Sequence, residues 1–563
     1  MGSRDERCQG SCLVAACESC SEKETMMHLP ARRNRLGRAA SIGALTSIML
    51  GSAFATNAPA GLAGSRSAAV PAHGGSYSIR VTDSADCLDP QKTGSATADE
   101  IDGYVFDSLL SIDKEGHYVG DLATKYKASN GGTRLTFTLR KNVKFSNGDP
   151  LTAQDVKYTF DRALDPATKS PVSASQLDGV TSTKVVDKYT VQLNLSAPNR
   201  PILTNLTGPY TGILDKKWFQ SHASQTCTQP VGSGPYKVQS TGGDFSNVAL
   251  AANKRHNFGP SWVKNKGVPY VTKITFKTIA SDATAVSEML SSGVDIATVP
   301  GTQLSRVKGH KTLALHRLKS QSLDFIEFNV TKPPFNSLAM RKAFAQLINR
   351  SAIVSAAYSG QALPVYGPLP QGIPYFDRAA KKYMPTYNPS AAASTISANH
   401  ASGPYTYLTV GLPTLSTEAE IVQQAAGSAG MQLKIDSKAG VGDFVKQAGA
   451  GDFNVLGLTA TYPDPDILYL LLHSSQGGGK GLNFTQETSN PALDSLLQKG
   501  RTTLSRKKIA SVYDQAQVLI NKQLKFIGVV APIVNLAVRS NIKGYHVNSL
   551  GASAIQDLYI KTK

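Results

Sequence analysis

The chain has 563 residues, a length that exceeds one hydrophobic core and predicts about two to four domains. Hydrophobic residues make up 41% of it and charged residues 18%, which is typical of a folded α/β protein and excludes wholesale disorder. The 59 Lys and Arg outnumber the 40 Asp and Glu and give a formal net charge of +19. These cations are scattered, without the zinc-finger spacing or aromatic stripe of a nucleic-acid binder, so we expect a solvated basic surface and no nucleic-acid partner.

We interpret residues 1–55 as an export-signal region. Four arginines lie within residues 32–38, an uncharged run occupies residues 39–54, and Ala53-Phe54-Ala55 has the form of a cleavage site. The run is short and rich in small residues, which favours a cleaved signal over a retained membrane anchor. The signal predicts an extracytoplasmic location, in the periplasm or at the outer face of the cell membrane or wall. There is no cysteine at the cleavage point, so nothing there indicates a lipid anchor. The choice between the general secretory and twin-arginine routes stays open.

Four cysteines within residues 8–20 precede this signal, and the last two form a C-x-x-C pair. Such a pair is also found in zinc and redox sites. Because the cysteines precede the signal and no folded unit surrounds them, we interpret residues 1–25 as untranslated, with Met26 or Met27 as the initiator.

Residues 56–75 are rich in Ala, Gly, Ser and Pro and are interpreted as a linker, after which order begins near Tyr77. Cys87 and Cys227 are the only cysteines beyond residue 55. An even pair in an exported protein favours a disulfide over two free thiols. We therefore expect Cys87 and Cys227 to be bonded.

The first regular elements show the two-residue period of half-buried strands. Residues 135–139 and 191–195 alternate apolar and polar side chains. Between them, Asn147-Gly148 predicts a tight turn. Thr152, followed three residues later by Asp155, resembles a capping box at the start of a helix. The helix would bury one face, formed by Val156, Phe160 and Ala163.

The later part of the chain alternates strands and helices. Residues 323–330 resemble a strand, and residues 338–353 place apolar side chains at helical spacing. Residues 416–436 predict a helix followed by a strand. Residues 491–524 are helical in two parts, and residues 526–540 are strand-like in their β-branched content. This succession predicts an α/β protein.

Known catalytic motifs are absent. "AGSAG" at 426–430 lacks the first glycine of a nucleophile elbow, and there is no H-E-x-x-H, P-loop or dinucleotide-binding motif. The ten histidines are dispersed, so we expect no metal, no cofactor and no catalytic residue. An exported hydrolase of peptides or glycans is the alternative, since folding can bring two distant carboxylates together.

The strongest candidates for a catalytic pair of carboxylates are Asp464 and Asp466 in "TATYPDPDILYLLLHS". The adjacent prolines hold this backbone extended. We interpret the two acids as ending a strand and capping a helix that starts near Ile467, with a ligand contact as the alternative.

Five blocks in order resemble the extracellular solute-binding proteins of ABC importers, specifically the large family that binds peptides and nickel. The blocks are "LTFTLRKNVKFSNGDPLTAQDVKYTFDRALDP" (135–166), "PVGSGPYKV" (230–238), "SGVDIATVP" (292–300), "FNVTKPPFNSLAMRKAFAQLINRSAIV" (328–354) and "YPDPDILYLLL" (462–472). The resemblance covers about residues 76–560.

The resemblance implies a two-lobed, periplasmic-binding-protein-like fold (class II, cluster C) with an extra inserted subdomain. Two hinged lobes of this kind close over a ligand. The chain would cross between the lobes near Phe328 and Phe526. It would act as a monomer with a small-molecule or peptide-like ligand and a membrane permease. Lobe I is expected at 76–110, 231–325 and 526–563, the inserted subdomain at 111–230, and lobe II at 326–525.

The resemblance also implies a ligand site at the end of a late strand. Peptide-binding members carry an aspartate there that pairs with the ligand's ammonium group, and this chain has Thr461. A buried ammonium without a counter-ion is costly, so free-amine peptides are disfavoured. The ligand classes that remain are a sugar, a modified peptide, an opine-like compound and a metal chelate. Asn349-Arg350 replaces the family's Asp-Arg, which we interpret as structural. The expected ligand-binding residues are Leu458, Thr459, Thr461, Tyr462, Tyr366 and Leu88.

Overall fold

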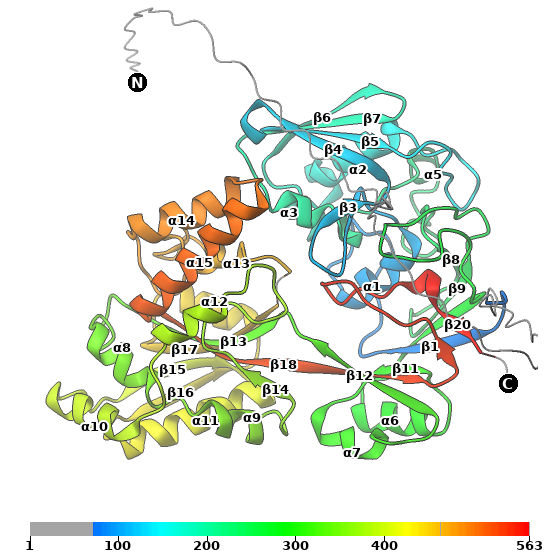
Figure 1. The fold of residues 1–563 in the computed structure, drawn as a ribbon. Coiled ribbons are helices and arrows are strands. Elements are labelled where there is room, and N and C mark those ends of the chain that lie inside the picture. Colours follow the sequence, from blue (N-terminus) through cyan, green and yellow to red (C-terminus); the bar gives the residue numbers. More distant parts are fainter. Residues whose placement is uncertain (1–70, 462, 562–563) are drawn as a thin grey trace, which may run out of the picture.

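The computed structural model describes residues 71–461 and 463–561. The export-signal region with its cysteines, residues 56–70 of the expected linker, and Tyr462 lie outside the described residues. Figure 1 shows two blocks of sheet and helix side by side, with the long strand β18 (Phe526–Arg539) running from one into the other. We call the block that holds both ends of the described chain lobe I and the other lobe II.

One twelve-stranded sheet extends through both lobes. Its main path runs in the order β16 (Leu433–Lys438), β15 (Tyr405–Val410), β17 (Val455–Thr461), β13 (Ser322–Phe328), β18, β11 (Ile296–Thr298), β1 (Ser76–Val81), β10 (Lys273–Thr278), β9 (Asn247–Ala252) and β8 (Tyr236–Ser240). Two further strands, β12 (Leu313–Lys319) and β14 (Ala362–Pro364), pair with β18 off this path. Most neighbouring strands are antiparallel, but β1 is parallel to β10 and β11, and β15 is parallel to β16 and β17.

The strand pairing fixes where the chain passes between the lobes. All of β13 pairs with β17 of lobe II, from Ser322 onward. The first residues of β18 pair with β13, whereas residues 533–539 pair with β12 of lobe I. The crossings therefore lie near residues 319–322 and near Pro532, and not at the expected Phe328 and Phe526. The first crossing precedes β13, because the whole of β13 belongs to lobe II, and the second lies within β18, because this strand changes lobes along its own length.

Lobe II has two hydrophobic cores, one on each face of the sheet. Successive residues of a strand point to opposite faces, and Phe325 and Ile326 accordingly enter different cores. The Ile326 core is covered by α8 (Leu338–Ala345), α9 (Arg350–Ala356), α10 (Pro389–Ala398) and α11 (Pro413–Ser428). The Phe325 core is covered by α12 (Val441–Gly449), α13 (Ile467–Leu472), α14 (Pro491–Thr502) and α15 (Arg506–Gln523).

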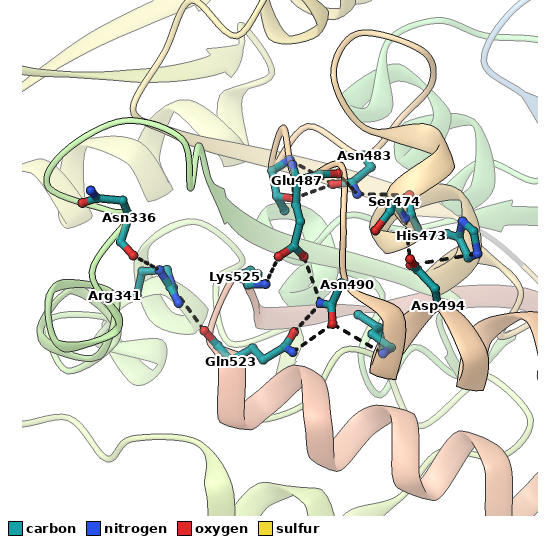
Figure 2. Close-up of polar contacts among 12 residues, drawn as sticks. Asn336, Arg341, His473, Ser474, Asn483, Glu487, Asn490, Asp494, Gln523 and Lys525 are labelled. Atoms are coloured by element: carbon teal, nitrogen blue, oxygen red, sulfur yellow. Dashed lines mark hydrogen bonds and ion pairs between the residues drawn. The ribbon is translucent and has the colours of Figure 1, made fainter.

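A polar network inside lobe II attaches the start of α14 to the start of β18 (Figure 2). Asn490 caps α14 and donates from Nδ2 to Glu487 Oε2 at 2.9 Å and to Gln523 Oε1 at 2.9 Å. Glu487 also forms an ion pair with Lys525, and Arg341 Nε donates to the Gln523 carbonyl at 3.1 Å. These contacts hold the connection between α13 and α14 against the sheet.

The inserted subdomain has its own sheet and core. Four antiparallel strands, in the order β4 (Ala123–Ser129), β5 (Arg134–Leu139), β7 (Thr190–Leu195) and β6 (Val180–Asp187), pack against α2 (Ala153–Leu164). The predicted strands and capping box are present: the Thr152 side chain accepts from the Gln154 N–H, and the Thr152 N–H donates to Asp155 at 2.8 Å. Val156, Phe160 and Ala163 are buried as predicted. A hairpin of β2 (Leu110–Ile112) and β3 (Tyr118–Gly120) leads into it.

Lobe I contains α1 (Ala96–Val105), α5 (Lys216–Ser221) and α6 (Asp282–Leu290) against β1, β10 and their neighbours. Cys87 and Cys227 form a disulfide with a Cα–Cα distance of 4.4 Å. Their neighbourhood is also joined by a backbone hydrogen bond from Leu88 N to Cys227 O at 3.0 Å. The remaining short elements are α3 (Ser173–Gln176), α4 (Ile202–Asn205), α7 (Leu304–Val307), β19 (Ile542–Lys543) and β20 (Tyr559–Ile560).

The helix predicted at 338–353 is in fact two helices, α8 and α9. Asn349 accepts a hydrogen bond from the Ala352 N–H at 3.0 Å and so begins α9, which is a capping role for Asn. Arg350 is buried, and its guanidinium donates to the carbonyls of Val365 and Gly528 at 2.7 Å. Both residues act structurally here, in agreement with the interpretation of Asn349-Arg350.

Candidate ligand cleft

A cavity of about 890 Å³ lies where both lobes and the β2–β3 hairpin meet. Lobe I contributes residues from segments 317–319 and 547–551, the hairpin contributes 114–116, and lobe II contributes residues from 371–375 and 506–510. Its volume falls in the range of small-molecule sites, about 300 to 1,000 Å³. A hinge movement of one lobe against the other would open or close this cavity.

Basic side chains dominate the charged lining of the cavity. One carboxylate, Glu115, lies among them. Arg506, at the first turn of α15, donates from Nη2 to the Glu115 carbonyl at 3.0 Å and so joins lobe II to the hairpin. The basic lining residues are Lys114, Arg317, Lys319, Arg506 and Lys507.

Tyr366 lines a second cavity of about 360 Å³ in lobe II, which shares Gln371 with the first. Two cations lie over its ring: the Arg350 guanidinium is 4.8 Å and Lys381 Nζ is 4.1 Å from the ring centroid. Cation–π contacts of this kind fix the ring. The structure thus places Tyr366 at a cavity next to the interlobe one.

The three described β17 residues of the expected site lie at the strand's carboxyl end. Thr461 is exposed, and its Oγ1 lies 2.6 Å from Ser322 Oγ on β13. Thr459 pairs with Asp324 in the sheet and hydrogen-bonds its carboxylate. Burial raises the pKa of Asp324 to about 6, against the hydrogen bonds from Tyr358 and Thr459. This end of β17 is therefore polar and adjoins the crossing between the lobes, but none of its three expected site residues lines the 890 Å³ cavity.

Leu458 and Leu88 pack in hydrophobic cores. Leu458 is half-buried against the core of lobe II that contains Phe325. Leu88 is fully buried in the core of lobe I, where its side chain is shielded from any ligand. The Leu88 expectation rested on family position, and the packing around the disulfide takes its side chain inward instead.

Asp464 joins lobe II to the inserted subdomain through a buried ion pair. Arg200, which is 2% exposed at its side chain, donates from Nη2 to Asp464 Oδ1 at 2.5 Å and from Nη1 to Oδ2 at 2.8 Å. Thr204 donates to Asp464 at 2.7 Å, and Arg200 Nε donates to the Gly500 carbonyl at 3.1 Å. The Arg200 N–H also donates to the Arg501 carbonyl at 2.6 Å. A bidentate pair with these additional bonds is a strong contact.

The pKa values of the two acids move in opposite directions. Burial alone would raise the pKa of Asp464, but the charge and hydrogen bonds of Arg200 outweigh it and lower the pKa. Burial raises the pKa of Asp466 to about 7, and Arg501, at 3.2 Å, only partly opposes this. The helix α13 begins at Ile467 as predicted, but the Asp466 side chain makes no capping bond. Asp464 serves as a structural acid and has no free oxygen for catalysis.

Among the described residues, Asp113, Glu115 and His117 form one group whose donor atoms lie within 4.8 Å of one another and whose residue types suit a metal. Asp113 already accepts from the His117 ring at 2.9 Å and from the Glu115 N–H at 3.0 Å. The group is largely exposed, and the expectation of no metal remains a prediction.

Sequence reasoning missed the Arg200–Asp464 pair and the basic cavity. Arg200 lies 264 residues from Asp464, and no local pattern around "NRPIL" indicates the partner. The cations of the cavity come from the hairpin and from both lobes, and they resemble the scattered basic residues of the rest of the chain.

The fold is that of a known class of proteins. The structure of HbpA2 from Haemophilus parasuis superposes with a TM-score of 0.76 at 21% sequence identity and covers 87% of this chain and 100% of that one. The molecule is a two-lobed, class II periplasmic-binding-protein fold, as the sequence predicted.

The sequence comparisons define the family. Residues 117–480 match the model of the middle region of bacterial extracellular solute-binding proteins, family 5, and the chain belongs to that family. The dipeptide-binding protein of Escherichia coli K12 is 25% identical over 477 residues, which cover 78% of this chain and 86% of that protein. The glutathione-binding protein GsiB of Shigella dysenteriae is 26% identical over 473 residues, which cover 82% of this chain and 90% of that protein.

The chain is thus a substrate-binding component of an ABC importer, and the hydrolase alternative is disfavoured. Its relatives are binding proteins rather than enzymes, and family members work with ABC permeases. Among the helices of the described residues, none is both long and apolar enough to cross a bilayer.

Proposed function

We propose that this protein captures a small solute in the 890 Å³ interlobe cavity and that its closed form is what a membrane permease recognises. The observation that carries the proposal is the cavity's lining, which comes from both lobes and from the hairpin. A ligand there contacts surfaces that a hinge movement would separate, so binding favours closure. We further propose that the protein is exported by its N-terminal signal and acts as a monomer.

Thr461 bears on the ligand class, although it lies at the crossing between the lobes and outside the lining of the 890 Å³ cavity. Relatives include a dipeptide-binding and a glutathione-binding protein, so a peptide-like solute fits this scaffold. Thr461 offers a hydroxyl, already hydrogen-bonded to Ser322, in place of a carboxylate for an ammonium group. We therefore propose a solute without a free α-amine, such as a modified peptide, an opine-like compound, a sugar or a chelate.

Native mass spectrometry of the purified protein tests capture directly, because a tightly bound solute survives desolvation. We expect a single additional mass per monomer and, by small-angle scattering, a smaller radius of gyration with that solute than after its removal. A rigid scattering profile, unchanged by solute, or a product released from it, contradicts the proposal.

Substitution at Thr461 tests the site. Thr461→Asp is expected to raise affinity for free-amine dipeptides at least about tenfold, since about 1.4 kcal/mol of added ion pairing suffices. Thr181→Asp, at an exposed strand position of the inserted subdomain, is the matched control and leaves binding unchanged. Equal titrations of a dipeptide library into both variants and the wild type would remove this end of β17 from the site.

A further inference from the structure

We propose that the solute held in the interlobe cavity is a small anion with at least two acidic groups, such as a polycarboxylate or an acidic conjugate. The inference rests on the proposed function and adds the charge of the ligand to it. It follows from the side chains that line the cavity.

The charge balance of the cavity differs from that of the chain. Five Lys and Arg and one carboxylate, Glu115, line it, whereas the whole chain has 59 Lys and Arg to 40 Asp and Glu. A concave site lined by one sign of charge concentrates the field inside it and attracts the opposite ion. Basic residues scattered at random over the surface would carry acidic neighbours at nearly the overall ratio.

None of the five cations has a carboxylate within 4.0 Å in the part of the chain that the structure describes. Other arginines at contacts between parts of the molecule do have one: Arg200 pairs with Asp464, and Arg162 pairs with Asp89 at 2.7 Å. The fold thus supplies close ion pairs where it holds parts together, whereas the nearest acids here, Glu115 in the lining and Asp113 beside Arg506, form no ion pair within 4.0 Å with the five cations.

Two walls of the cavity, one from each lobe, each carry a pair of cations. On β12 of lobe I, Arg317 and Lys319 are two residues apart and so point to the same face of the strand. On lobe II, Arg506 and Lys507 form the first turn of α15, an 18-residue helix whose N-cap side chain makes no capping bond, so free N–H groups and the positive end of the helix dipole add to their charge.

A neutral donor completes the lining. Asn548 is 8% exposed, and its Oδ1 accepts from the N–H groups of Leu550 and Ala552. Next to it in the lining, the Ser549 Oγ is buried and has no hydrogen-bond partner among the described residues. A buried hydroxyl without a partner is unfavourable unless a ligand or water pairs with it, and an anion oxygen is a suitable acceptor.

This arrangement couples the ligand's charge to closure. Without an anion, the cations of β12 and of α15 repel each other across the cavity and favour separation of the lobes. An anion with two acidic groups reaches both walls and replaces that repulsion by charge-assisted hydrogen bonds. A single small cation or an uncharged solute offers neither effect.

The test is titration of the full-length exported chain with citrate, succinate and inorganic phosphate, with sorbitol and putrescine as neutral and cationic probes, at constant ionic strength. We expect at least one multivalent anion to bind saturably, one per monomer, and to contract the protein in scattering. The charge-reversal double variant Arg317→Glu/Lys319→Glu is expected to lose affinity at least about tenfold, which corresponds to about 1.4 kcal/mol, because it replaces two attractive charges by two repulsive ones.

Lys308→Glu/Lys311→Glu is the matched control, because both lysines are exposed in lobe I, lie outside the cavity lining and change the net charge equally. Equal losses in the two double variants, or no saturable binding of any anion in the panel, overturn the proposal. Capture of a neutral or cationic solute between lobes that still close would overturn it while leaving the proposed function intact. Lobes that close on no solute at all would overturn both.

Discussion

Arg200 and Arg506 both form contacts between lobe II and another part of the molecule, the inserted subdomain for Arg200 and the β2–β3 hairpin for Arg506, yet their surroundings are opposite. Arg200 is buried, and its guanidinium is bonded to Asp464, to a carbonyl and to tyrosine hydroxyls. Arg506 is exposed, and its described hydrogen bond goes to the carbonyl of Glu115 at 3.0 Å. The first contact pairs both of its charges with each other inside the protein, and the second leaves the Arg506 charge without an ion pair, available to the proposed ligand. One interface can therefore hold the lobes together and still bind.

Breaking the buried contact is expected to have the largest effect. Arg200→Ala leaves Asp464 buried and without its counter-charge, and removing one partner of a buried pair costs about 3–5 kcal/mol. Chemical denaturation would measure this as a lower unfolding midpoint. Arg134→Ala, at an exposed position of β5 in the same subdomain, is the matched control and should change stability little.

The double variant Arg200→Leu/Asp464→Leu separates the pair's net contribution from the penalty of an orphaned charge. Because apolar replacements of buried pairs are often neutral in stability, it is expected to recover most of the loss of Arg200→Ala. It is also expected to remove the geometric constraint on closure, which scattering would report as a broader distribution of lobe separations. A double variant as unstable as Arg200→Ala contradicts this account.

The next effect is a dependence on pH at Asp466. Its pKa is raised to about 7 in the folded protein, above its usual value of 3.8, so the folded state keeps a proton that the unfolded state releases between these values. Stability therefore falls as pH rises from about 4 to about 7. Asp466→Asn has no such titration, and its stability relative to wild type is expected to increase with pH across this window, as unfolding at pH 4.5 and 7.5 would show.

Asp464 contributes the opposite trend and marks the limit of that window. Its pKa is lowered in the folded state, so its stabilisation is complete above the usual Asp value and is lost as pH falls below it. The Asp466→Asn comparison is therefore made above pH 4. Asp178→Asn, at an exposed position, is the control, and an equal pH profile for both variants would assign the effect to general charge.

The fold was largely predictable, because its signals are local. The alternation in β5 and β7, the capping box at Thr152 and the apolar face of α2 each involve residues within a few positions of one another. The crossings between lobes were less predictable. The position of each crossing depends on which strands pair, and the sequence pattern of β13 is the same whether this strand lies before or after the hinge.

The site was predictable only in outline. The late loop that contains Asp464 does lie between parts of the molecule, but its acid contacts Arg200, and the side chain of Leu88 is in a core. Ion pairs between residues hundreds of positions apart leave no periodic signal. A cavity lined by five separate segments likewise gives no pattern until the chain is folded.

The smallest effect on stability, and the sharpest contrast with Arg200, is expected at Arg506. Its contact is exposed, where such interactions contribute about 0–1 kcal/mol and are screened by salt. Arg506→Ala should therefore unfold within about 1 kcal/mol of wild type. The affinity of Arg506→Ala for a multivalent anion should nevertheless be severalfold lower than that of wild type at low salt. This difference should shrink at high salt, because salt screens the attraction between an exposed cation and the anion.

Arg200→Ala should show the reverse, a large loss of stability that salt changes little, since a buried pair is poorly screened. If Arg506→Ala lost as much stability as Arg200→Ala, or kept its anion affinity at low salt, the assignment of stability to Arg200 and of anion binding to Arg506 would be wrong.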